Sequence, residues 1–237
     1  MLEIILYSTL GLLGTAIGAF LGIFFGKKMI GKTLAITAGI MGGLVIFDLF
    51  PLSLSLSDPI VALISTAIGI LGVMLLGNVI GKFQPLKQKN RMINSGLILL
   101  FSMALHNFPE GMAIGSGGAE STQTGFIIAL TIALHDIPEG MAVATPFVGG
   151  SVKNRKVFLM TIFSSLSTIV GAVIGYLLGS ISDYTNAICL GIASGAMLYV
   201  VVRELLPGSL KSSSVRDVII FSFVGVLISI IFISVIG

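Results

Sequence analysis

Two copies of one motif stand close together in the chain, ALHNFPEGMAIG at residues 104–115 and ALHDIPEGMAVA at residues 133–144. Eight of the twelve positions are identical at an offset of 29 residues. Each copy lies in its own apolar stretch, so the two copies are expected to cross a bilayer in opposite directions. Inverted repeats of this kind are typical of transporters, whose binding sites lie near the middle of the membrane.

The composition around the motifs is that of a membrane protein. Of the 237 residues, 55% are hydrophobic and 10% are charged, and the mean hydropathy is +1.11. Soluble domains carry roughly 25% charged residues, and a spanning helix needs about 20 apolar residues. We therefore predict an all-α integral membrane protein, a single polytopic domain over 1–237 with eight transmembrane helices. The expected spans are 3–26, 33–53, 59–80, 93–115, 124–146, 156–180, 184–206 and 216–236.

The basic residues predict the orientation of these spans. All thirteen Lys and Arg lie at the ends of, or directly after, the first, third, fifth and seventh spans, and Lys and Arg near helix ends favour the cytoplasmic side. The charged residues of the opposite loops are Asp58, Glu120 and Asp183. We expect a multi-pass protein of the plasma membrane with both termini outside. The net charge of +3 is therefore a topology signal and predicts no nucleic-acid partner.

A weaker repeat joins the second and seventh spans. AGIMGGLVIFDLFP at 38–51 and SGAMLYVVVRELLP at 194–207 share five of fourteen positions and pair Asp48 with Glu204. The chain is thus expected to form a 3+2+3 inverted-repeat arrangement, with Asp48 at the outer end and Glu204 at the inner end. Acidic rings line cation paths in channels, but acidic residues near helix ends are also ordinary interface residues, and Arg203 stands beside Glu204. Both interpretations stay open.

The two His residues of the chain occupy the same place in the motif. His106 and Glu110 are separated by four residues, as are His135 and Glu139, so each pair lies on one face of a helix. A single buried His is more often a hydrogen-bonded polar residue than a ligand, but the duplicated frame favours ligands. Gly111 and Gly140 follow directly, and small residues are expected to let these two helices approach each other.

Charge makes the metal hypothesis stronger. Glu110, Asp136 and Glu139 lie deep in the expected spans, far from every Lys and Arg, and each charged side chain costs about 2.5–3.5 kcal/mol there. The carboxyl groups are therefore protonated or neutralised by a cation. Imidazole with carboxylate suits zinc, with Fe(II), Mn(II) or Cd(II) as further candidates. Asn107 and Asp136 could hold a second ion, although Asn107 could equally bond a backbone carbonyl.

HNFPEG at 106–111 and HDIPEG at 135–140 resemble the signature of the fourth and fifth helices of the ZIP (Zrt/Irt-like) family of metal-ion transporters, most closely its bacterial members. The resemblance covers essentially the whole chain and implies import of divalent metals, usually zinc, by a transport bundle that slides against a scaffold, often in a homodimer. It also implies a binuclear site with one ion on His106, Glu110, His135 and Glu139 and the other on Asn107, Asp136 and a shared glutamate.

The chain departs from the family pattern in two places. Many bacterial relatives add a carboxylate on the sixth helix, where this chain has Thr168, so the second metal position is expected to be weaker. The loop GKFQPLKQKNRM at 81–92 lacks the His cluster common in the family. The single cysteine, Cys189, is interpreted as a packing residue.

These observations predict a transporter of divalent metal ions with no catalytic residues and no catalytic cofactor. One alternative is an intramembrane metal-dependent hydrolase, because zinc on His and Glu can activate water. The chain lacks the paired His of His-Glu-x-x-His, and a hydrolase needs no antiparallel duplicate. Another alternative is a proton-coupled exchanger whose carboxyl groups carry protons and no metal.

Overall fold

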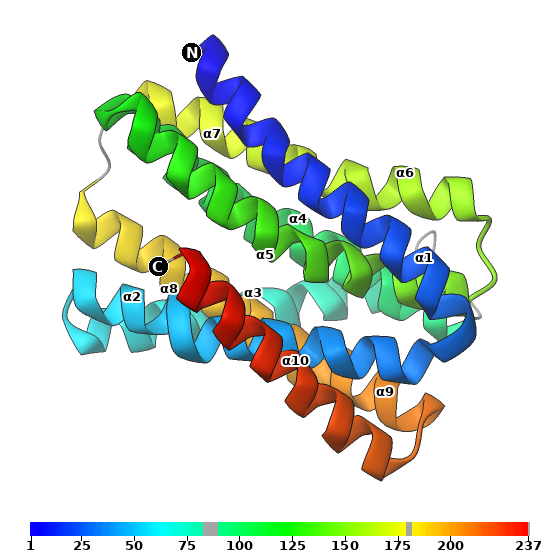
Figure 1. Cartoon of the computed structure of the whole chain (residues 1–237). Helices are drawn as coiled ribbons and strands as arrows, with labels where there is room; N and C mark the ends of the chain where they lie inside the picture. The colour runs from blue at the N-terminus through cyan, green and yellow to red at the C-terminus, as the bar shows by residue number, and fades with distance from the viewer. Residues whose placement is uncertain (83–89, 179–181, 237) are drawn as a thin grey trace.

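A computed structural model describes residues 1–82, 90–178 and 182–236, which form a bundle of helices (Figure 1). Within these ranges, eight segments are long and apolar enough to cross a membrane. They are Leu2–Gly26, Met29–Leu56, Pro59–Val79, Arg91–Ala119, Thr122–Gly149, Asn154–Leu177, Asp183–Ser212 and Val215–Ser234. The eight predicted spans are confirmed, with ends that differ by a few residues. The chain is an all-α membrane protein.

The spans are built from twelve helical elements in the described residues. The first six are α1 (Leu2–Leu44), η1 (Val45–Leu49), α2 (Phe50–Leu56), α3 (Pro59–Lys82), α4 (Arg91–Glu120) and α5 (Thr122–Gly149). The remaining six are α6 (Asn154–Ser164), α7 (Leu166–Leu178), α8 (Asp183–Val200), η2 (Val201–Leu205), α9 (Leu206–Ser212) and α10 (Val215–Ile236).

The first two spans are joined by a kink. α1 runs through both of them and departs from helical geometry only at Met29, where φ is −142° and ψ is 48°. The kink of α1, the α5–α6 connection and the α9–α10 connection lie at the same end of the bundle, on the right of Figure 1. This end carries described basic residues such as Lys32, Lys153 and Arg216. Following the predicted orientation, it is called the inner end below, and the opposite end is called the outer end.

Two π-helical segments occupy equivalent places in the weaker repeat. η1 and η2 each have five residues, and their bounds differ by 156 positions, the same offset that pairs Asp48 with Glu204. Pro51 and Pro207 then stand in the first turn of α2 and α9. π-Turns widen a helix locally and are frequent at functional sites. The repeat therefore includes an irregular backbone feature that carries an acidic side chain in both copies.

Two buried serines make equivalent bonds between helices. Ser53 of α2 donates to the carbonyl of Ala187 in α8 (2.8 Å), and Ser209 of α9 donates to the carbonyl of Gly31 in α1 (2.7 Å). Both donor and acceptor are again displaced by 156 positions. These matched bonds are what an inverted repeat produces. The full 3+2+3 arrangement stays a prediction.

A third repeat, absent from the sequence interpretation, appears in the packing. TAIGAFLG at 15–22 lies on α1 and TIVGAVIG at 168–175 lies on α7. A Cβ on Gly140 of α5 would meet the backbone of Thr15 and Ala19, and a Cβ on Gly111 of α4 would meet the backbone of Thr168 and Ala172. α1 thus packs against α5 as α7 packs against α4.

Candidate metal site

The two motif copies lie in the middle of long, capped helices. Asn90 accepts a hydrogen bond from the backbone of Met92 at the start of α4, and Ser121 accepts one from Thr124 at the start of α5. These caps satisfy amides that the first turn leaves free. Both helices continue through their internal prolines, Pro109 and Pro138. Long helices held at their ends place the motif side chains at the centre of the bundle.

Three buried side chains converge at this centre. Nε2 of His106 lies 3.1 Å from Oε1 of Glu110 and 3.0 Å from Oε1 of Glu139. One ligand atom from each residue lies within 4.8 Å of the other two. Ligands at about 2.0–2.2 Å from a tetrahedral zinc ion stand roughly 3–3.5 Å apart. The spacing therefore fits one divalent ion held by atoms from both motif copies.

Asn107 is tied to this cluster. With its amide oriented so that the nitrogen faces the acceptors, Asn107 donates to the carbonyl of Met103 (2.9 Å) and to Oε2 of Glu139 (3.0 Å). The first bond matches the interpretation of Asn107 as a partner of a backbone carbonyl, and the second fixes the Glu139 carboxylate. In this arrangement the Asn107 amide orients a ligand of the cluster.

Asp136 lies between the cluster, where it interacts with Glu139, and a different pair of helices. Its side chain is fully buried, and both carboxylate oxygens lack a hydrogen-bond donor among the described residues. A Cβ built on Gly11 of α1 would lie 2.6 Å from Oδ2 of Asp136 and 3.6 Å from Cγ2 of Thr168. Asp136 therefore lies beside Thr168, and the neutral Thr168 supplies no second carboxylate there.

His135 and the two motif glycines were expected to lie between α4 and α5. The backbone of His135 lies in α5, but its side chain is outside the described part of the structure, so its place relative to the cluster stays a prediction. The expectation that Gly111 and Gly140 bring α4 and α5 together is wrong. These glycines pack against α7 and α1, because the repeated helices supply the small residues that a close backbone approach requires.

Among the described residues, the cluster has no Lys or Arg partner. Beyond the two contacts of His106, the ion pair present is Lys32–Asp217 at the inner end, with 3.9 Å between Nζ and Oδ1. Apart from the imidazole of His106, both oxygens of Glu110 and Oε1 of Glu139 have no hydrogen-bond donor in the described part of the chain. Buried carboxylates without donors are costly in an apolar surrounding. A visiting cation would satisfy them.

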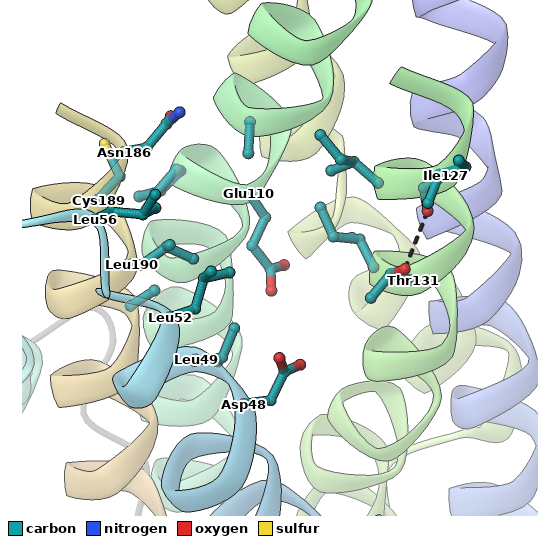
Figure 2. A pocket seen from close by; sticks show the side chains of 15 residues that line it. Asp48, Leu49, Leu52, Leu56, Glu110, Ile127, Thr131, Asn186, Cys189 and Leu190 are labelled. Carbon is teal, nitrogen blue, oxygen red and sulfur yellow. Dashed lines mark hydrogen bonds between the residues drawn. The ribbon is translucent and has the colours of Figure 1, made fainter. Parts of the chain in front are cut away.

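A cavity of about 300 Å³ reaches this cluster from the outer end. Figure 2 shows the carboxylates of Glu110 and Asp48 facing the same space, with Cys189 and Asn186 on one wall and Thr131 on the other. The lining comes from η1, α2, α4, α5 and α8: Asp48, Leu49, Leu52, Leu56, Pro109, Glu110, Ala113, Ile127, Ile128, Thr131, Ile132, Asn186, Cys189, Leu190 and Ala193. The site is therefore open toward the outer end.

The structure places Asp48 and Glu204 differently. Asp48 is half-buried and lines the outer cavity. Glu204, also half-buried, interacts with the hydroxyl of Ser95 and with the basic side chains of Lys211 and Arg203. Of these two acidic residues, Asp48 is the one on a route to the His106, Glu110 and Glu139 cluster in this conformation.

The cavity wall formed by α8 was not predicted from the sequence. Cys189, interpreted as a packing residue, is half-buried and lines the cavity together with Asn186 and Leu190. Cys189 and Leu190 follow Asn186 by three and four residues, so they share its face of α8. The polar Asn186, one turn before Cys189, is the signal that could have marked this face. The loop at 81–92, which lacks a His cluster, lies largely outside the described residues.

Comparison with known proteins identifies relatives of this chain. A sequence model of the family described as "ZIP Zinc transporter" matches residues 82–237. "Zinc transporter ZupT" of Chlorobium luteolum is 33% identical over 232 residues, covering 86% of this chain and 87% of the relative. The protein of that name from Escherichia coli O7:K1 is 32% identical over 208 residues, covering 81% of each.

A shorter match has higher identity. The chain is 37% identical to "Zinc transporter ZupT" of Corynebacterium aurimucosum over 122 residues, which are 51% of this chain and 46% of the relative. The chain therefore spans about half the length of that relative, whereas the matches in Chlorobium and Escherichia extend over most of both chains. The long matches and the family match together show that this chain belongs to the ZIP zinc transporter family.

Proposed function

We propose that this protein carries divalent metal ions, with zinc as the main substrate, across the plasma membrane into the cytoplasm. One observation carries the proposal: His106, Glu110 and Glu139 converge in a buried cluster that has no Lys or Arg partner among the described residues and is reached by an outer cavity. The names of the relatives add zinc as the substrate. An open route to a cluster of this kind fits a transporter better than a hydrolase.

The ligand set belongs to the same proposal. His106, Glu110, His135 and Glu139 hold the transported ion, and Asn107 orients Glu139. Asp136 offers a weaker second position beside Thr168. The ion enters past Asp48 and leaves past Glu204, with both chain termini on the outer side. A membrane potential of 100 mV, negative inside, favours entry by about 2.3 kcal/mol for each elementary charge, and a divalent ion gains about twice this.

Zinc flux into proteoliposomes tests the proposal. His106→Ala and Glu139→Ala should each abolish flux while the purified variants keep their helical content and elution volume. Ser116→Ala is the matched control, because Ser116 is buried on the same helix, ten residues from His106, and bonds the carbonyl of Ala113. Wild-type flux in both ligand variants would defeat the assignment. Peptide cleavage by the wild type would favour the hydrolase alternative, and proton flux through metal-free protein would favour the proton-coupled exchanger.

A further inference from the structure

The cluster must open toward the inner end before an ion can leave, and the repeats identify the residues that would form that route. Adding or subtracting the repeat offsets of 29 and 156 positions gives, for each residue of the outer cavity, the residue at the equivalent place in the inner half. The equivalent of Asp48 is Glu204, that of Glu110 is Glu139, that of Thr131 is Ser102 and that of Cys189 is Thr33. These inner equivalents form one set, drawn from α1, α4, α5, η2 and α9.

The inner set is packed shut in this conformation. Thr131 and Cys189 are half-buried at the outer cavity, whereas Ser102 and Thr33 are 1% and 3% exposed. Five apolar members of the set are closed in the same way, namely Leu34, Leu99, Met103, Ala142 and Leu205, each at most 2% exposed. Equivalent residues thus surround a cavity in one half and a packed core in the other.

The packed inner half contains a polar group that is not hydrogen-bonded within the described part of the chain, the side chain of Ser102. Its hydroxyl is buried and has no hydrogen-bond partner among the described residues. Its equivalent, Thr131, lines the outer cavity and donates to the carbonyl of Ile127 (3.0 Å). A buried polar group without a partner is rare and needs a physical reason. A reason exists if Ser102 faces water and ions when the inner half is open.

We infer that Ser102, Thr33 and Thr37, together with Glu204 and Glu139, line the inner release path of the transported ion. Thr37 is the equivalent of Ala193 and is fully buried here. This inference rests on the proposed function, because it assumes that the cluster carries an ion. It adds the identity of the inner wall. That wall has the hydroxyl of Thr33 where the outer wall has the thiol of Cys189, so a thiophilic ion meets a weaker ligand at this position on its way out.

The single cysteine gives a direct test. The exchange variant Cys189→Thr with Thr33→Cys swaps two equivalent side chains and moves the chain's single thiol from the outer wall to the inner wall. The probe is the membrane-impermeant anion 2-sulfonatoethyl methanethiosulfonate. The thiolate attacks its sulfenyl sulfur, a disulfide forms and methanesulfinate leaves. Wild-type Cys189 should react from the outer face, and the exchange variant should react from the inner face.

Zinc should change the two reactions in opposite ways. External zinc should slow the outer-face reaction of wild-type Cys189, because the ion occupies the cavity that this thiol lines. A zinc gradient that drives turnover should raise the inner-face reaction of the exchange variant at least about threefold, because the inner half then opens repeatedly. Ser102→Cys in the Cys189→Thr background repeats the test if the exchange variant does not fold. Leu100→Cys in that background is the matched control. Leu100 is 6% exposed on the same helix, and its equivalent, Ala129, is fully buried and lies off the outer cavity.

Zinc flux measured in the same vesicles separates a failure of the proposed transport function from a failure of the inferred release path. If the wild type carries no zinc, the proposed function fails. If the cysteine variants carry zinc but neither position 33 nor position 102 reacts from the inner face, the inference alone is overturned. Equal reaction at position 100 overturns it as well, because general loosening of the inner half would then explain the labelling. Inner-face reaction at 33 or 102 with an inert position 100 supports it.

Discussion

Asp48 and Glu204 stand in equivalent π-helical segments, yet only Asp48 lies on an open route to the metal cluster in this conformation. The residues around them are also equivalent, with Thr131 and Cys189 in the outer half and Ser102 and Thr33 in the inner half. The difference between the halves lies in their packing, because the backbone motifs are the same. Access to the cluster is therefore a property of how helices meet, which a conformational change can reverse.

The largest expected effect concerns the two equivalent glutamates. Glu110→Gln and Glu139→Gln should each lower zinc flux at least about 100-fold, since about 2.8 kcal/mol of binding free energy corresponds to that factor. Flux and bound zinc per protein should be measured together. Because Glu110 lines the outer cavity, Glu110→Gln should also remove the protection of Cys189 by external zinc. Protection that survives in this variant would place the outer zinc position elsewhere.

The next effect concerns the glycines that position the two motif helices. Gly111→Ala and Gly140→Ala should each lower the free energy of unfolding by about 1–3 kcal/mol, because the new methyl group meets the backbone of α7 or α1. Thermal unfolding in detergent measures the loss. Gly72→Ala is the control, because a Cβ there has no neighbour within 4 Å. Similar losses at 111 and 140 support equivalent packing, and a loss at one position alone contradicts it.

A smaller effect separates the two acidic residues of the path. Asp48→Asn should raise the KM of zinc uptake about tenfold with little change in the maximal rate, because a negative charge in an open cavity raises the local cation concentration. Glu204→Gln should lower the maximal rate about threefold with little change in KM, because Glu204 is reached after translocation. Initial uptake rates over a range of zinc concentrations distinguish the two. A change in the same parameter for both variants would remove the distinction.

The smallest effect compares buried serines. Ser53→Ala and Ser209→Ala should each lower the free energy of unfolding by about 1 kcal/mol, because each removes a bond between helices. Ser102→Ala should leave stability unchanged or raise it, because its hydroxyl lacks a partner among the described residues. Thermal unfolding measures all three. A loss at Ser102 equal to that at Ser53 would show that Ser102 is satisfied in the resting protein.

Much of this architecture could be predicted because its signals are strong. The spans follow from long apolar stretches, and the cluster follows from a duplicated His-Glu frame. The kink at Met29 and the π-segments could not be predicted, and Asn186 was the single signal in the sequence for the wall at Cys189. Spanning helices are apolar on most sides, so the sequence does not mark which face packs on protein and which faces lipid. The same uniformity hid the TxxGAxxG repeat and led to the wrong partners for Gly111 and Gly140.

The π-segments also set the rotation of everything that follows them. A π-turn accommodates one residue more than an α-turn, so deletion of one residue within 45–49 would let the helix continue as a regular α-helix. The downstream residues of α2 would then rotate by about 100° and withdraw by about 1.5 Å relative to the preceding part. Leu52 and Leu56 would leave the cavity wall that they now form. The extra residue in each π-turn thus sets the rotational position of the residues that follow it. A residue within 201–205 would have to be deleted as well to keep the two halves alike.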